Sequence, residues 1–210
     1  MDISVADFYQ KITIILTDLG IILKIKAIPA EVEDPIPFEQ DHTHDTYDKE
    51  QVKTLHTALL SMQDTLMKFR CGFKGKCSPV HFFWGSFDLA VSRFSGRRAP
   101  KHPGGIPNLP DWVAEEAYSH EVMSCGFWPG SQAFPEAAFY CYLYPEPEGF
   151  KNAIVHPREA YYNDTLREFI LPYKAVQNAP NPHKMLLEFL ESTYEAGAAL
   201  AHWDREALEM

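Results

Sequence analysis

The stretch that decides the fold runs from Cys77 to Pro100 and reads CSPVHFFWGSFDLAVSRFSGRRAP. It contains two apolar runs rich in aromatic and β-branched residues, Val80 to Trp84 and Phe87 to Val91, and each has the length of a strand. Gly85-Ser86 between them is a dipeptide of the kind that closes two-residue β-hairpin turns. The stretch therefore predicts a β-hairpin.

A two-residue turn would fix which side chains of the hairpin share a face, because cross-strand partners point to the same side. Phe83 then pairs with Asp88, and His81 pairs with Ala90, so His81 and Asp88 are expected on one face. A slip of one residue would reverse the assignment for one strand. The other face is apolar and is expected to be core; it carries Val80, Phe82, Trp84, Phe87, Leu89 and Val91.

A group of basic residues follows the hairpin. Arg93, Arg97, Arg98 and Lys101 lie close together in a chain whose net charge is -10. Such a local basic group suits a small anionic ligand, since guanidinium groups bind carboxylates and phosphates in a bidentate manner. The acidic balance of the whole chain argues against nucleic acid and against an anionic membrane, because binding to either is dominated by neutralising phosphates.

Four segments together resemble a known family. They are SPVHFFWGSFDLAVSRFSGRRAP at 78–100, HPGG at 102–105, AYSHEV at 117–122 and GFWPG at 126–130. They are similar to an uncharacterised bacterial family described only as a domain of unknown function, and the similarity covers nearly the whole chain. The resemblance implies no activity and no catalytic residues. It does imply that members have a strand-rich region ahead of the point equivalent to Met1, so that this chain is the later part of a larger unit.

The length and composition set ordinary bounds. A chain of 210 residues with 46% hydrophobic and 23% charged residues predicts a single domain, residues 1–210. The most apolar early stretch, residues 12–28, is interrupted by Asp18, Lys24 and Lys26, so no membrane span is expected. No secretory leader is recognised, which predicts a soluble protein of the cytoplasm. The cysteines at 71, 77, 125 and 141 lack C-x-x-C spacing and are expected to be reduced thiols.

The order of predicted elements indicates an α+β fold in which helices pack on a mostly antiparallel sheet in two layers. Ser4, Asp48 and Asn181 are the predicted caps of three long helices. The other face of the sheet is expected to be a cavity wall, or to be covered by the region that the family resemblance implies ahead of Met1, by self-association or by a partner. The predicted helices are 5–19, 49–70, a short one after Asp111, and 182–203; the predicted strands are 21–28, the hairpin, 122–128, 137–144 and 166–171.

The loop motif DHTHD at 41–45 is the sequence's most metal-like feature. Imidazole and carboxylate groups together suit zinc, iron or manganese. His42 and His44 lie in a polar loop without a predicted strand beneath them, so no metal and no cofactor is expected. If a metal were held elsewhere, the alternative ligands would be His81, Asp88, His120 and Glu121.

Two interpretations of function remain open. The first is a small-molecule site, enzymatic or not, in which an ionisable base, an orienting carboxylate and cationic donors converge. No established catalytic motif supports it. The second is a non-catalytic structural or interaction domain, with the aromatic hairpin as core and the arginines paired to the chain's own carboxylates. For the first, the catalytic candidates are His81, Asp88, His120 and Glu121, and the binding candidates are Arg93, Arg97, Arg98, His102 and Trp84.

Overall fold

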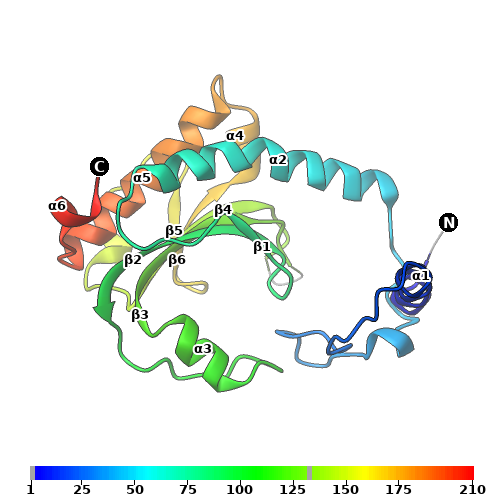
Figure 1. The fold of residues 1–210 in the computed structure, drawn as a ribbon. Helices are drawn as coiled ribbons and strands as arrows, with labels where there is room; N and C mark the ends of the chain where they lie inside the picture. The colour runs from blue at the N-terminus through cyan, green and yellow to red at the C-terminus, as the bar shows by residue number, and fades with distance from the viewer. Residues whose placement is uncertain (1–2, 132–133) are drawn as a thin grey trace. The chain divides into compact units, whose positions relative to one another are not determined.

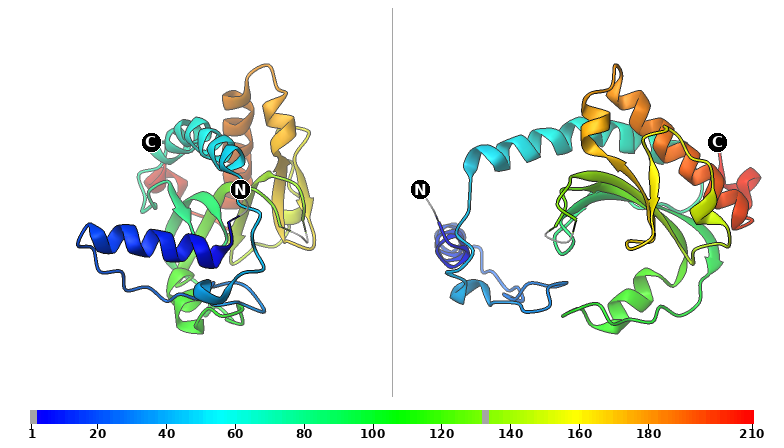
Figure 2. Two further views of the ribbon diagram at one scale, coloured as in Figure 1. Left: turned by 90° about the vertical axis from the view of Figure 1, so that its right-hand side faces the viewer. Right: turned by 180° about the vertical axis from the view of Figure 1, so that it is seen from behind.

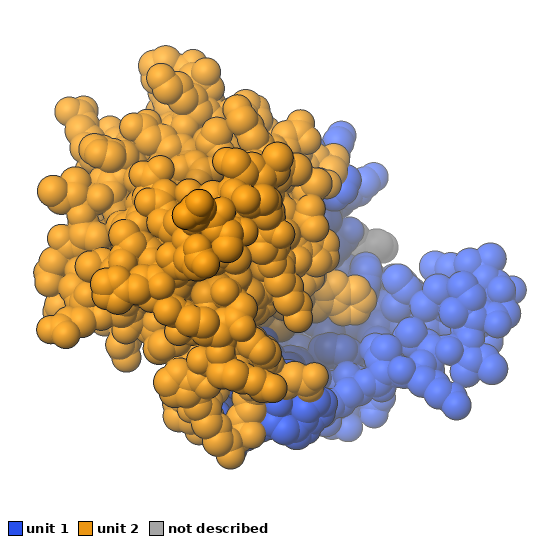
Figure 3. Space-filling model, turned by 60° about the vertical axis from the view of Figure 1, so that its left-hand side comes forward, with its two compact units in different colours: residues 1–58, 104–114 blue, residues 59–103, 115–210 orange. Residues whose placement is uncertain are grey.

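A computed structural model of the chain describes residues 3–131 and 134–210. The chain forms two compact units, which Figure 3 colours separately. Unit 1 comprises Met1–Ala58 and Gly104–Ala114, and unit 2 comprises Leu59–Pro103 and Glu115–Met210. The sheet and every candidate site residue named above belong to unit 2. A single domain stays a prediction.

Unit 1 is built on helix α1 (Val5–Asp18), the short 3-10 helix η1 (Phe38–Gln40) and the first part of α2 (Lys49–Cys71). The Ser4 hydroxyl accepts from the Asp7 backbone N–H, and Asp48 accepts from the N–H groups of Glu50 and Gln51, so both predicted helix caps are confirmed. In the loop, Asp41 accepts from the backbone N–H groups of residues 43 and 44 and lies 2.8 Å from the His44 ring.

One prediction for unit 1 was wrong. Residues 21–28 form no strand, although their apolar and lysine residues alternate, because no neighbouring strand pairs with them. The apolar residues of α1 are largely exposed: Phe8 and Ile15 of the helix are exposed, as is Leu19 at its C-terminal cap, to 70%. Periodicity identified an amphipathic helix correctly but did not show what would cover its apolar side.

Unit 2 is organised around one antiparallel sheet in the order β1-β2-β3-β4-β6-β5. The predicted α+β class, with helices packed on an antiparallel sheet, is confirmed. Both predicted strand pairs, the hairpin and 122–128 with 137–144, are present. The strands are β1 (His81–Phe83), β2 (Asp88–Arg98), β3 (His120–Trp128), β4 (Ala138–Tyr144), β5 (Tyr161–Asn163) and β6 (Glu168–Pro172).

The sheet is strongly curved, and its convex side carries the main helices (Figures 1 and 2). These are α5 (Pro182–Leu200), capped by Asn181 as predicted, and the Leu59–Cys71 part of α2. Arg93 of β2 packs against Phe69 of α2 and Tyr194 of α5. The short helices of the chain are α3 (Asp111–Ala117), η2 (Phe150–Asn152), α4 (Tyr173–Gln177) and α6 (Arg205–Leu208).

The hairpin register is confirmed, but its turn is longer than predicted. Phe83 pairs with Asp88, and His81 pairs with Ala90. Residues 84–87 form the turn, and Phe87 adopts a left-handed backbone conformation with φ of 60°. Because Trp84 lies in this turn rather than in a strand, its side chain is 85% exposed, and its predicted place in the core was wrong.

The exposure of Trp84 changes the expected cost of removing it. We expect Trp84→Ala to alter the free energy of unfolding by less than about 0.5 kcal/mol, as for a surface substitution. Phe82→Ala, on the strand beside it and half-buried, is the matched control and is expected to cost more. Urea denaturation of both variants measures this, and a large loss in Trp84→Ala would show that the turn is packed in solution.

Candidate functional site

The concave face of the sheet, opposite α2 and α5, brings together the polar residues of four strands. We define it by the even-numbered residues that share this side through the strand register. They are Asp88, Ala90 and Ser92 of β2, Ser124 and Gly126 of β3, Tyr140 and Tyr142 of β4, and Glu168 of β6.

Asp88 is the most buried carboxylate on the concave face, at 6% exposure. It accepts hydrogen bonds from the Tyr140 hydroxyl and, at 2.7 Å, from the Ser86 hydroxyl. No lysine or arginine of the described residues forms an ion pair with it. Two neutral donors therefore hold the Asp88 side chain out of solvent.

Gly126 allows this contact. Tyr140 lies on β4 and Asp88 on β2, and β3 separates them, so the Tyr140 ring must cross β3 close to its backbone. A Cβ at Gly126 would clash with the Leu89 carbonyl and would lie 2.8 Å from the Tyr140 oxygen. The absence of a side chain at Gly126 is what leaves room for the Tyr140 phenol.

A second set of hydroxyl groups continues along the face. The Tyr142 and Tyr118 hydroxyls are 2.7 Å apart, and the Ser92 hydroxyl donates to Ser124 at 3.3 Å. Burial, and after it the charge of Asp88, raises the pKa of Tyr140 well above its usual value. Burial, and after it the neighbouring Tyr118, raises the pKa of Tyr142 well above its usual value. Both phenols are thus neutral hydrogen-bonding groups at physiological pH.

Glu168 is the second carboxyl group of the concave face. It pairs with Asn163 through the backbone, and its half-buried side chain has no hydrogen bond or ion pair with any described residue. Burial raises the pKa of Glu168 from 4.5 to about 7, and the negative charge of Asp88 contributes a smaller part of this rise. Sequence reasoning missed Glu168, Tyr140 and Gly126, because only the strand order brings them to the same face as Asp88.

The structure places the predicted site residues on two different faces. His81, Asp88, Arg98 and His120 belong to the concave side, where Arg98 pairs with His120 across β2 and β3. His102 joins them indirectly, since its ring stacks on Tyr118 at 4.7 Å. Trp84 lies in the exposed turn.

Arg93, Arg97 and Glu121 lie on the helix-covered side. The Arg93 guanidinium carbon is 3.4 Å from the centre of the Phe69 ring and 4.4 Å from that of Tyr194, and its nitrogen is 3.5 Å from the Glu191 carboxylate. Arg93 is 1% exposed. A guanidinium enclosed in this way is part of the core between the sheet and the helices.

Arg97 is engaged by the protein itself. Its guanidinium donates to the Glu121 carboxylate at 2.7 Å and 2.9 Å. It also donates to the carbonyls of Ala201 and His202, which follow the C-terminal end of α5. A cation suits this place, because the last carbonyls of a helix carry partial negative charge.

We therefore expect Arg97→Ala to lower the free energy of unfolding rather than to weaken the binding of an anion. The loss should be about 1–2 kcal/mol, since the contacts are charge-assisted but partly exposed to water. Urea denaturation with and without 10 mM phosphate measures it, with Lys101→Ala, which removes another cation of the same loop, as control. A loss of stability that appears only when phosphate is present would contradict the assignment.

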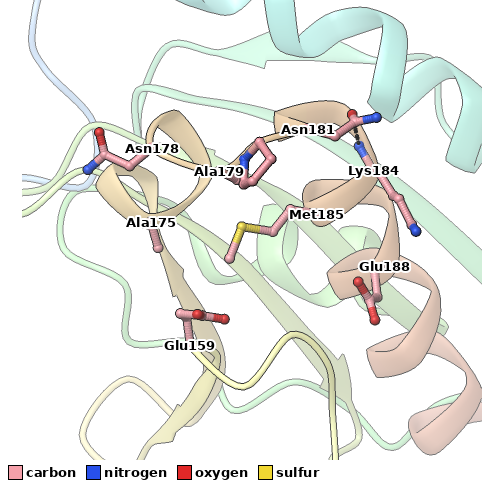
Figure 4. A pocket seen from close by; sticks show the side chains of 9 residues that line it. Glu159, Ala175, Asn178, Ala179, Asn181, Lys184, Met185 and Glu188 are labelled. Atoms are coloured by element: carbon pink, nitrogen blue, oxygen red, sulfur yellow. Dashed lines mark hydrogen bonds between the residues drawn. The ribbon is translucent and has the colours of Figure 1, made fainter.

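The described surface also has a cavity of about 610 Å³ beside α4 and α5 (Figure 4). Glu159, Lys184 and Glu188 are among the residues that line it, and it contains no candidate residue predicted from the sequence. Among the described residues, no group of three or more His, Cys, Asp or Glu side chains is arranged to hold a metal ion. Within the same residues, no helix has the length and apolar character needed to span a membrane.

Comparison with known proteins places the chain in a family but assigns it no activity. No curated protein and no solved structure matches the sequence. A family match extends over residues 1–210, the whole length of the chain. The chain belongs to this family, which is described as a family of unknown function (DUF5996).

Proposed function

We propose that the concave face of the sheet binds a small molecule that carries a negatively charged group and a group able to exchange a proton. The supporting observation is that one face gathers two carboxyl groups, Asp88 and Glu168, and also the cross-strand pair Arg98 and His120. A site with acid, base and cation on one surface has the components of general acid–base chemistry.

The cationic part of the face is assigned to the anionic group of the ligand. Arg98 is exposed and forms no ion pair with a described residue, whereas Arg93 and Arg97 are bound by Glu191 and Glu121. His120 lies next to Arg98 across the strands, and its ring nitrogen is 3.1 Å from the Ser119 hydroxyl. A guanidinium beside an imidazole is suited to a carboxylate or a phosphate.

The buried part of the face lies at the other end of β2 from Arg98, beyond the reach of a small anion held there, and would bind a separate apolar group. Trp128, Phe134 and Leu166 pack around the buried Tyr140, so apolar surface adjoins the Asp88 carboxylate. Small-molecule sites commonly combine apolar walls with a few polar groups that fix orientation.

A thermal-shift titration tests this proposal with phosphate, sulfate, acetate and succinate at constant ionic strength. A ligand at about 100 times its dissociation constant stabilises the folded state by about 2.7 kcal/mol. For a chain of this size, that is a rise in melting temperature of about 5–10 °C. We expect at least one of these probes to give a saturable rise.

The variants identify the surface responsible for the rise. Arg98→Ala should abolish it, while Lys184→Ala, a cation lining the cavity beside α5, should retain it. The proposal is overturned if no probe gives a saturable rise, or if the rise survives in Arg98→Ala. Those results would favour the second interpretation, in which the polar residues of the concave face serve only the fold.

A further inference from the structure

We infer that helix α1 of unit 1 is a self-association surface, at which two copies of this chain form a dimer with their α1 helices side by side and antiparallel. The surface is the apolar stripe of α1, which we define as Phe8, Ile12, Ile15 and Leu19. The inference concerns unit 1 and is independent of the function proposed for the concave face, which belongs to unit 2.

The first observation is that α1 is apolar on two sides, and its own unit covers only one of them. Tyr9 and Leu16 are half-buried, and the Tyr9 ring lies 5.8 Å from that of Phe38 in η1. The residues of the apolar stripe are 39–70% exposed. Phe8 has a neighbouring ring, Tyr47 at 5.7 Å, which is itself exposed. Large apolar residues gathered on one exposed side of a helix mark an interaction site.

The second observation is the spacing of the apolar stripe. Its residues are four, three and four positions apart, the alternation of the a and d positions in a heptad repeat. Side chains at this spacing form a narrow seam that interlocks with the same seam of a second helix. The spacing therefore favours another helix as the occupant of the stripe, and a second copy of the chain supplies a matching one.

The third observation is charge, which decides the orientation. Lys11 and Asp18 occupy the g positions beside the stripe, are exposed, and form no ion pair with a described residue. In an antiparallel pair the g positions face each other, so Lys11 of each copy meets Asp18 of the other, twice by symmetry. In a parallel pair each g position faces an e position, and the e positions Tyr9 and Leu16 are turned toward their own unit.

The size of the surface sets the strength of the dimer. With 14 residues, α1 is about 21 Å long. Three exposed apolar residues that follow the helix add to the apolar surface of the unit, namely Ile21, Ile22 and Ile25. Standard interfaces bury about 800 Å² on each partner, and a contact between two helices of this length is smaller, so we expect a dissociation constant on the order of 10 µM.

Sedimentation equilibrium of the full chain between about 5 and 200 µM tests the dimer. The weight-average mass of the parent protein should rise with concentration toward that of two chains. Ile15→Glu should stay monomeric, because it places a carboxylate in the seam of each copy. Ile14→Glu is the matched control, since Ile14 is as exposed as Ile15, at 53% against 57%, but lies outside the stripe; it should associate like the parent. Circular dichroism verifies that both variants are folded.

A charge exchange distinguishes a second copy from any other occupant. Lys11→Glu and Asp18→Lys should each weaken the dimer by about three- to tenfold, because each places like charges together twice. The double variant should return to the parent's dissociation constant, because both members of the pair are reversed.

The inference is overturned if the parent stays monomeric at every concentration, since something other than a second copy would then cover the stripe. It is also overturned if Ile15→Glu associates like the parent, or if Ile14→Glu dissociates the dimer as much as Ile15→Glu does. A double charge variant that associates no better than the single ones would refute the antiparallel pairing of the α1 helices.

Discussion

Glu168→Gln is expected to stabilise the protein at pH 8 and to have little effect at pH 5. The pKa of Glu168 is raised above its ordinary value of 4.5 to about 7, so its neutral form is favoured in the folded state. The corresponding stability is present in full below about pH 4.5 and is lost as the pH rises through 7. Glutamine resembles the protonated carboxyl group and does not lose a proton.

The size of this effect follows from the rise in pKa. A rise from 4.5 to about 7 corresponds to about 3 kcal/mol when the carboxylate is fully ionised. The melting temperature of Glu168→Gln at pH 8 should then exceed that of the parent by about 5–10 °C. Scanning calorimetry at pH 5 and pH 8 measures the difference, with Glu188→Gln, an exposed glutamate of α5, as control. An equal melting temperature for the variant and the parent at pH 8 would show that Glu168 is solvated.

Arg93→Ala is expected to cause the largest loss of stability. The substitution removes a buried guanidinium stacked between Phe69 and Tyr194 and leaves the Glu191 carboxylate without its cation. Truncating a large, fully buried side chain and opening a cavity costs about 3–5 kcal/mol. Because the guanidinium is planar, Arg93→Lys should restore only part of this loss.

Denaturant unfolding of the two Arg93 variants and of Arg98→Ala makes the comparison. Arg98 is exposed and unpaired among the described residues, so its removal should change stability by less than about 0.5 kcal/mol. Similar losses in Arg93→Ala and Arg98→Ala would contradict the placement of Arg93 in the core.

The helix caps and the hairpin register could be predicted because they depend on local sequence. Ser4, Asp48 and Asn181 cap helices wherever those helices pack, and alternation across a short turn keeps Asp88 and His81 on one face. The register remained correct even though the turn has four residues, because Phe87 adopts a left-handed conformation that preserves the Phe83–Asp88 pair.

The site could be predicted only in part, because its partners come from distant strands. Arg93 and Arg97 resemble a ligand-binding group in sequence, but alternation along β2 and the irregular pairing between Phe94 and Arg98 direct them away from Arg98. Glu168 lies eighty residues after Asp88 in the sequence, and only the order of the strands in the sheet brings both to the same face. The strand predicted at residues 21–28 also failed, since alternation indicates a strand but not the neighbour that pairs with it.

The central claim is that the concave face is the functional surface of this protein. The most direct test is a ¹⁵N backbone NMR titration with the probe that gives the largest thermal shift, or with succinate if none does. We predict saturable changes confined to residues 83–98, 120–128 and 138–144, which contain Asp88, Arg98, His120 and Tyr140. Changes that increase linearly without saturation, or that centre on Lys184 and the cavity beside α5, would contradict the claim.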